Sequence, residues 1–175
     1  MYYSANLKKK LLISFVVFIL IVLLDQLTKR FMINDIGLNN SKPFIPGIME
    51  FMVVQNTGGA FSIFKEYPIY FQIIGLVNVL IFSYLAFCPT KAFNTITKLG
   101  CVCILGGTVG NLIDRFLLSG VIDFLDLQLF NFAVFNLADV FIDIGVVLII
   151  IGWILSGKKN IQCHSEPKAK NLLTL

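Results

Sequence analysis

Charged side chains and histidine are scarce in this chain. Of its 175 residues only 14% are charged and one is histidine, whereas 57% are hydrophobic and the mean hydropathy is +0.86. This composition lies outside the range of soluble globular domains and is typical of a polytopic membrane protein. The only histidine, His164, lies in the polar C-terminal segment. No Ser-His or Cys-His arrangement is therefore available for nucleophilic catalysis.

Cysteines are also few, and none of the four falls in a predicted outer loop. No disulfide framework is therefore expected. Cys101 and Cys103 are two residues apart and point to different sides of a helix, which argues against a shared metal ion. Cys163 beside His164 is too small a set for a zinc site. We expect no metal and no cofactor.

Four apolar runs are long enough to cross the hydrocarbon core of about 30 Å, which takes about 20 helical residues. They are residues 11–31, 68–87, 96–118 and 137–155. The first resembles the apolar part of a secretory signal peptide, but no small-residue cleavage pattern follows it, so we expect it to be retained. The prediction is one membrane domain over residues 1–175, with a polar cytoplasmic tail at 158–175.

The lysines predict the orientation. Those of the N-terminal leader, the short connector after the second run and the C-terminal tail lie on one side of the membrane, and few basic residues lie in the opposite loops. By the positive-inside rule both termini are cytoplasmic. The net charge of +4 is explained by this orientation and by anionic headgroups, and no nucleic-acid partner is expected.

Most of the acidic residues gather at the opposite, outer face. An ionised carboxylate within a membrane segment costs about 2.5 to 3.5 kcal/mol, so it is a candidate functional group that needs a partner. Asp114 ends one apolar run and Asp139 opens the next. If the two runs are consecutive antiparallel helices, these carboxylates lie at one depth and could form an acid/base pair.

The two outer loops are expected to form small β-hairpin-like elements. In the first loop GIMEFMVV has β-favouring residues, NTGG at residues 56–59 supplies a turn, and AFSIF continues as an extended segment. The second loop, SGVIDFLDLQLFNFAVFN, alternates apolar and polar residues and is predicted to pack beside it. The fold class is thus an all-α membrane protein with four transmembrane helices and β-hairpin-like elements in both outer loops.

Polar residues near the helix ends have two interpretations each. Asp25 and Lys29 are four residues apart and can pair on one helix face, as an interfacial anchor or as part of a site. Asn136 suits a helix cap, and Asp139 benefits from the helix amino end. GGxxG at residues 106–110 indicates close helix packing.

Five motifs, in order and with this topology, resemble the bacterial lipoprotein signal peptidases (signal peptidase II). They are DQLTK at Asp25–Lys29, NTGGAF at Asn56–Phe61, GGTVGNLIDR at Gly106–Arg115, VIDF at Val121–Phe124 and FNLAD at Phe135–Asp139. The resemblance covers residues 11–155. It implies an aspartic endopeptidase of the bacterial cytoplasmic (inner) membrane that cleaves diacylglyceryl-modified prolipoproteins on the amino side of the lipid-modified cysteine.

The resemblance also implies site residues. The catalytic pair falls on Asp114 and Asp139, and the supporting positions fall on Asp25, Lys29, Asn56, Asn111, Arg115 and Asn136. Membrane lipids and prolipoproteins are the expected partners, and the protein is expected to be a monomer. Asp143, one turn below Asp139, is an acid outside the family motif.

From the residues alone, an enzyme and a carboxylate pathway for ions or protons are equally supported, and a non-catalytic scaffold is a third alternative. The resemblance decides for the peptidase. In that mechanism two close carboxylates share one proton, one taking a proton from water and the other protonating the carbonyl oxygen, with no fixed assignment of acid and base.

Overall fold

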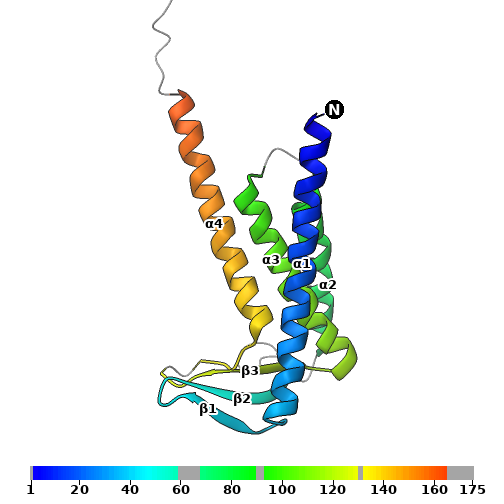
Figure 1. Ribbon diagram of the computed structural model, residues 1–175, viewed down its shortest axis with the longest axis vertical. Coiled ribbons are helices and arrows are strands. Elements are labelled where there is room, and N and C mark those ends of the chain that lie inside the picture. Colours follow the sequence, from blue (N-terminus) through cyan, green and yellow to red (C-terminus); the bar gives the residue numbers. More distant parts are fainter. Residues whose placement is uncertain (1, 59–67, 90–92, 130–131, 165–175) are drawn as a thin grey trace, which may run out of the picture.

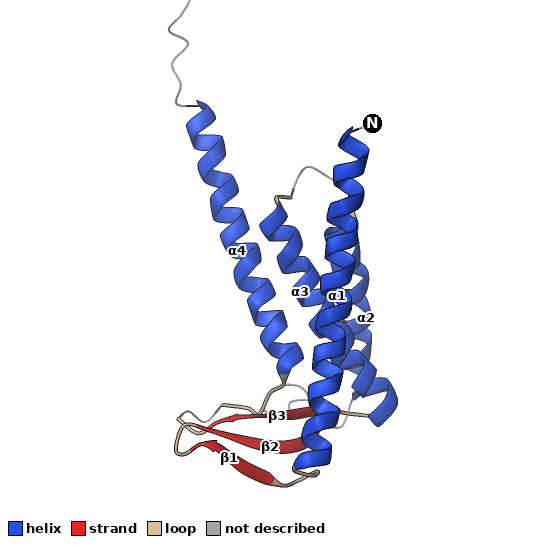
Figure 2. Ribbon diagram, viewed as in Figure 1, coloured by secondary structure: helices blue, strands red, loops and turns tan. Residues whose placement is uncertain are grey.

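The computed structural model describes residues 2–58, 68–89, 93–129 and 132–164, and it consists of four helices with a small sheet at one end (Figures 1 and 2). The elements in chain order are α1 (Tyr2–Asp35), β1 (Ser41–Ile45), β2 (Met49–Asn56), α2 (Pro68–Phe87), α3 (Thr95–Leu118), β3 (Val121–Leu127) and α4 (Leu137–His164). All four helices are long and apolar enough to span a membrane. The predicted fold class is confirmed.

Two helices extend beyond the predicted membrane runs. α1 begins at Tyr2 and ends at Asp35, and α4 continues to His164, into the segment predicted as a polar tail. Hydropathy marks where the chain leaves the apolar layer, but it does not mark where helical backbone ends. The rest of the predicted tail lies outside the described residues.

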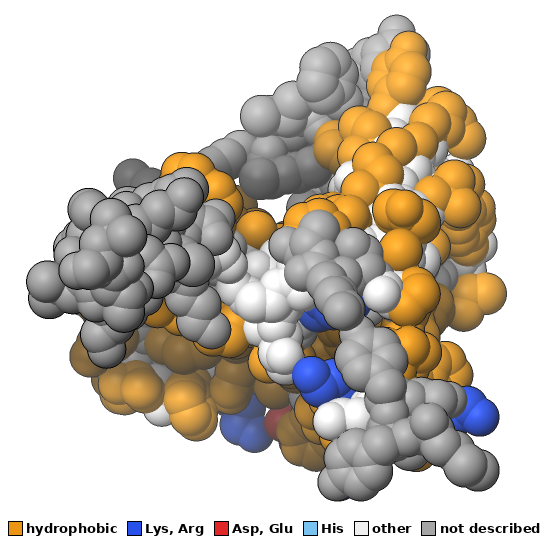
Figure 3. Space-filling view, turned by 90° about the horizontal axis from the view of Figure 1, so that it is seen from above, with side chains coloured by type: hydrophobic (Ala, Val, Ile, Leu, Met, Phe, Trp, Pro, Cys, Tyr) orange, Lys and Arg blue, Asp and Glu red, His pale blue; other side chains and the backbone are white. Residues whose placement is uncertain are grey.

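α3 is the central helix, with α1, α2 and α4 around it (Figure 1). In its most apolar window 67% of the residues are buried, against 11%, 11% and 17% in α1, α2 and α4. The other helices keep mainly hydrophobic side chains on their outer flanks, as the end-on view in Figure 3 shows. This is the pattern expected when lipid covers those flanks.

Glycines allow α3 and α4 to approach closely, as predicted for the GGxxG segment. A Cβ atom at Gly107 would collide with the carbonyl oxygen of Ala138, and one at Gly100 would lie 2.6 Å from the carbonyl oxygen of Gly145. Backbone contact of this kind is the usual basis of helix association in lipid. It also places the first turn of α4 directly against α3, next to Asn111.

The sheet lies across the helix ends, in the order β1-β2-β3 with both pairs antiparallel. β3 comes from the second outer loop, so the prediction that this loop packs beside the first is confirmed. Val53, Ile122 and Phe124 form the sheet's core against the C-terminal end of α1.

The hairpin differs from the predicted one. β2 begins at Met49, within the segment GIMEFMVV, and pairs with Ser41–Ile45 through a turn at Gly47, which has a φ of 73°. NTGG is therefore not the turn of this hairpin, and Asn56 instead ends β2. The predicted extended segment AFSIF lies outside the described residues. The sequence has a glycine-containing turn signal both at Gly47 and in NTGG, and only the pairing of the strands shows which one joins the hairpin.

Candidate active site

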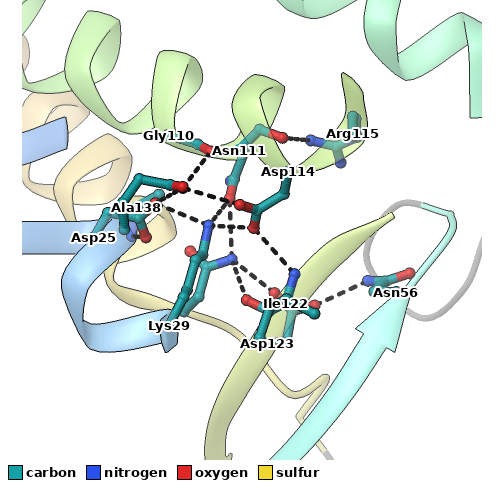
Figure 4. A network of polar contacts seen from close by, with 12 residues as sticks. Asp25, Lys29, Asn56, Gly110, Asn111, Asp114, Arg115, Ile122, Asp123 and Ala138 are labelled. Carbon is teal, nitrogen blue, oxygen red and sulfur yellow. Dashed lines mark hydrogen bonds and ion pairs between the residues drawn. The ribbon is translucent and has the colours of Figure 1, made fainter. Parts of the chain in front are cut away.

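Lys29 is the centre of a polar cluster between α1, α3 and β3 (Figure 4). Its side chain is buried, with 2% of the residue exposed. Its ammonium nitrogen Nζ lies 2.9 Å from Asp25 Oδ2, 2.8 Å from Asp114 Oδ2 and 3.0 Å from Asn111 Oδ1. These contacts use all three N–H donors of the ammonium group. The predicted pairing with Asp25 is confirmed, and the interpretation of Lys29 as an interfacial anchor is wrong.

Asp114 joins three elements. Besides Lys29, its carboxylate accepts hydrogen bonds from Gln26 Nε2 on α1 at 2.9 Å and from the backbone N–H of Ile122 on β3 at 3.1 Å. Both oxygens are therefore occupied by donors of the protein, and the residue is buried. Asp114 fixes where β3 begins relative to α3.

Asp25 supports the start of α4. Its Oδ1 accepts a hydrogen bond from the backbone N–H of Ala138 at 3.0 Å, and Gln26 Nε2 lies 3.2 Å from Oδ2. The first N–H groups of a helix have no partner within the helix, and a carboxylate there is also favoured by the helix dipole. Asp25 thus provides this cap from a different helix.

Asn136 and Asp139 cap α4 reciprocally. The backbone N–H of Asp139 donates to Asn136 Oδ1 at 3.0 Å, and the backbone N–H of Asn136 donates to Asp139 Oδ2 at 3.2 Å. This is a capping box with Asp in the place of Glu. The predicted cap is confirmed, and the same bonds hold the Asp139 side chain in a defined orientation.

Asn111 connects the cluster around Lys29 to Asp139. Its Oδ1 accepts from Lys29 and from Asn136 Nδ2 at 3.0 Å, while its Nδ2 donates to Asp139 Oδ1 at 2.8 Å. The amide therefore separates the ammonium group from Asp139. In the described residues Asp139 receives only neutral N–H donors.

Asp123 is a third buried carboxyl group, on β3. It accepts from Asn136 Nδ2 at 2.7 Å and from Asn56 Nδ2 at 3.1 Å. Burial, and next the nearby Asp139 carboxylate, raise the pKa of Asp123 to about 7; the Asn56 and Asn136 bonds and the Lys29 charge oppose this rise. Asp123 and Asp139 are therefore close enough to interact, and they are bound by neutral amides.

A cavity of about 440 Å³ opens beside this pair. Its polar lining includes Asn56, Asn111, Arg115, Asp123, Asp139 and Asp143, and apolar residues of β3 and of the segment before α4 complete it. Asp25, Lys29 and Asp114 do not line it. Arg115 packs its guanidinium over the Phe71 ring, 5.5 Å from the centroid, and leaves donors for the cavity.

The structure brings all eight predicted site residues to one end of the bundle. They divide into Asp25, Lys29 and Asp114 behind the cavity wall and Asn56, Asn111, Arg115 and Asp139 on the wall, with Asn136 buried between them. Two contributors were not predicted, Asp123 and Gln26. The motif VIDF contains Asp123, and the alternation in this loop puts Asp123 between apolar neighbours, which is the signal for a buried carboxyl group.

The fold and the site define a polytopic membrane protein with buried carboxyl groups around a cavity at one helix end. Comparisons with known proteins specify the class further. A family model described as signal peptidase (SPase) II matches residues 17–155. The chain therefore belongs to the signal peptidase II family, a family of aspartic peptidases.

Relatives and solved structures agree. The chain is 35% identical over 153 residues to the lipoprotein signal peptidase of Lactobacillus johnsonii, covering 87% of this chain and 99% of that protein. It is 41% identical over 145 residues to that of Nostoc sp., covering 82% and 89%. A solved bacterial membrane enzyme matches with a TM-score of 0.72 and 28% identity, over 91% of this chain and 93% of the other.

Proposed function

We propose that this protein removes the signal peptide of diacylglyceryl-modified prolipoproteins by cutting on the amino side of the lipid-modified cysteine, with two aspartates activating water. The observation that carries the proposal is the pair Asp123 and Asp139, which line one cavity and receive only neutral hydrogen-bond donors from the described residues. The names of the relatives support the substrate class.

The geometry favours Asp123 over Asp114 as the partner of Asp139. A carboxylate that must accept a proton from water needs free access to the substrate and no fixed positive charge on its oxygens. Asp114 is bound by Lys29 at 2.8 Å and lies outside the cavity lining. The assignment of Asp114 from the sequence stays a prediction, and we propose for it a positioning role instead.

In the proposed reaction the ionised member of the pair takes a proton from a water molecule while the water oxygen bonds to the scissile carbonyl carbon. The protonated member gives its proton to the carbonyl oxygen. When the tetrahedral intermediate collapses, the C–N bond breaks, the member that took the proton from water gives it to the departing amine, and one hydroxyl of the intermediate returns its proton to the other member as the C=O bond re-forms. The pair then again holds one proton. Because the two groups titrate together, acid and base are roles of the pair.

Arg115 and the outer sheet position the peptide. Arg115 donates N–H groups from the α3 wall toward the cavity, where a peptide carbonyl can accept them. Asn56 holds Asp123 and is itself fixed by the Gly58 N–H at 3.0 Å. The diacylglyceryl group lies in the leaflet beside the helices, so partitioning into lipid also orients the substrate.

The proposal includes the location. The site end faces outward in the bacterial cytoplasmic membrane, both termini are cytoplasmic, and the protein acts as a monomer in contact with membrane lipids. The lysines at the other end of the bundle support this orientation. An impermeant thiol reagent on intact cells should label a cysteine placed at Ser119 and should not label Cys163.

The test is incubation of the purified protein, in lipid or detergent, with a diacylglyceryl-modified prolipoprotein and with the same precursor lacking the lipid. We expect release of the signal peptide from the modified precursor only. Asp139→Asn should abolish it, and Asp126→Asn, on the same face of the membrane but outside the cavity, should not. Cleavage by the Asp139→Asn protein at the wild-type rate would reject the proposal.

A further inference from the structure

Asp143 is the one acid of the cavity lining to which the mechanism gives no role. It lies on α4 one turn below Asp139, at i+4 on the same face, as the sequence predicted, and its side chain is exposed. Among the described residues no hydrogen bond or ion pair reaches its carboxylate. Asp139, by contrast, is held by Asn111 and Asn136.

A carboxylate on a membrane-spanning helix is costly to insert, so it is a candidate functional group. Asp143 lines the cavity beside Asp123 and Asp139, so a substrate bound there comes within reach of its carboxylate, which can accept a hydrogen bond. Because Asp143 lines the cavity, it can contact a bound peptide.

The depth of Asp143 tells which part of the substrate it meets. Four residues of helix advance the chain by about 6 Å toward the cytoplasmic end of α4. The signal peptide is the membrane-embedded part of a precursor, on the amino side of the cut, so it continues from the pair in this direction. An extended peptide covers about 6 Å in roughly two residues.

We propose that Asp143 is a specificity-determining residue of the site: its carboxylate accepts a hydrogen bond from a hydroxyl side chain about two residues before the scissile bond. This inference rests on the proposed function. A hydroxyl is the donor that suits this place, because it costs an apolar membrane segment far less than a charged group does. The site then prefers serine or threonine there over an apolar residue of the same size.

The test uses two diacylglyceryl-modified precursors that differ only in threonine or valine at the second residue before the cut, because these side chains have nearly the same shape. For the wild-type protein we expect kcat/KM to be about tenfold higher with threonine, as for a hydrogen bond to a charged group. Asp143→Leu should bring the ratio close to one, mainly by raising KM for the threonine substrate. Asp143→Asn, which keeps an acceptor oxygen, should retain part of the preference.

The matched control is Asp35→Asn, another exposed acid on a membrane helix, which pairs with Lys42 away from the cavity. It should leave the ratio unchanged. A wild-type ratio near one, or a ratio that persists in Asp143→Leu, overturns the inference, and so does an equal loss on both substrates. In each of these cases cleavage itself still occurs and the proposed function stands. If the wild type cleaves neither precursor, the proposed function fails and this inference fails with it.

Discussion

The polar cluster has two sides, and the carboxylates on the two sides have different hydrogen-bond donors. Behind the cavity wall, Asp25 and Asp114 share the ammonium group of Lys29 at 2.9 and 2.8 Å. On the cavity side, Asp123 and Asp139 receive hydrogen bonds from asparagine amides and backbone N–H groups only. Asn111 and Asn136 form the boundary between the two sides.

This difference indicates which carboxyl groups hold the helices and the sheet together and which suit proton transfer. A carboxylate that accepts hydrogen bonds from a buried ammonium group is held in one position, which suits a group that joins α1, α3, β3 and α4. Two carboxyl groups with neutral donors and a low-dielectric surrounding tend to share a proton, which suits proton transfer. We therefore propose that the same residue type has two functions within one cluster, and that its bonding partners distinguish them.

The largest effect on stability is expected from removing the cation. Lys29→Met leaves two buried carboxylates uncompensated, and the loss of one partner of a buried ion pair costs about 3 to 5 kcal/mol of unfolding free energy. The thermal unfolding midpoint in detergent should fall strongly. Adding Asp114→Asn to Lys29→Met should recover part of the loss, because it removes one of the unpaired charges.

Lys42→Met provides the control for Lys29→Met. Lys42 Nζ lies 3.0 Å from Asp35 Oδ2, a distance similar to those in the Lys29 pairs. Both side chains are exposed, however, by 61% and 41%. Exposed pairs contribute about 0 to 1 kcal/mol, so the midpoint should hardly move. Equal falls of the unfolding midpoint in the two variants would show that the cluster around Lys29 does not stabilise the fold more than an exposed ion pair does.

A smaller loss is expected where α3 meets α4. Gly107→Ala places a methyl group against the carbonyl of Ala138, so the backbones must separate at a cost of about 1 to 3 kcal/mol. Asp139 lies one residue beyond, and cleavage should fall as well. Gly75→Ala is the comparison, because it meets only the Leu112 side chain, on the α2 face of α3. It should lower stability slightly and leave cleavage intact.

The pH profile tests the cavity side. Burial and the neighbouring Asp139 raise the pKa of Asp123 to about 7. Below that pH the Asp123 carboxyl group is protonated and can supply a proton, and above it that proton is lost. Cleavage should therefore decline above pH 7, by about tenfold per pH unit.

Asn56 offers a way to move that decline. Its hydrogen bond favours the ionised form of Asp123 and opposes the rise of the pKa. Asn56→Leu should shift the alkaline decline of cleavage to higher pH. A decline that stays in place would show that Asp123 does not set it.

Sequence patterns predicted the helices and the end of the bundle that holds the site, because both follow from hydropathy and lysine placement. The run at residues 68–87 became α2 with the same bounds. Which carboxyl groups lie next to each other within the cluster was harder to predict from the sequence. The pairing of Asp114 with Asp139 stays a prediction that rests on their positions at helix ends. The carboxyl group that lines the cavity together with Asp139, and that we propose as its partner, is Asp123 on β3. The register of β3 against β2, which brings Asp123 to Asn56, depends on tertiary contacts.

Lys29 shows a second limit of local patterns. The spacing of Asp25 and Lys29 predicted their pairing correctly, since it depends only on helix geometry. Whether the pair lies at the interface or in the core depends on what packs over it. Asn111 and Asp114 come from α3, more than 80 residues further along the chain, and no local pattern contains them.

The most direct test of the two-sided account compares Asp123→Asn with Asp114→Asn in one preparation, measuring cleavage of a lipid-modified precursor and the thermal unfolding midpoint together. Asp123→Asn should lower kcat by about 10³-fold or more at an almost unchanged midpoint, because it removes a proton-transferring group and keeps the shape. Asp114→Asn should lower the midpoint clearly, because it leaves Lys29 with one carboxylate, and the correctly folded fraction should still cleave. Near wild-type turnover in Asp123→Asn, with complete loss in a stably folded Asp114→Asn, would contradict the account and return the catalytic role to Asp114.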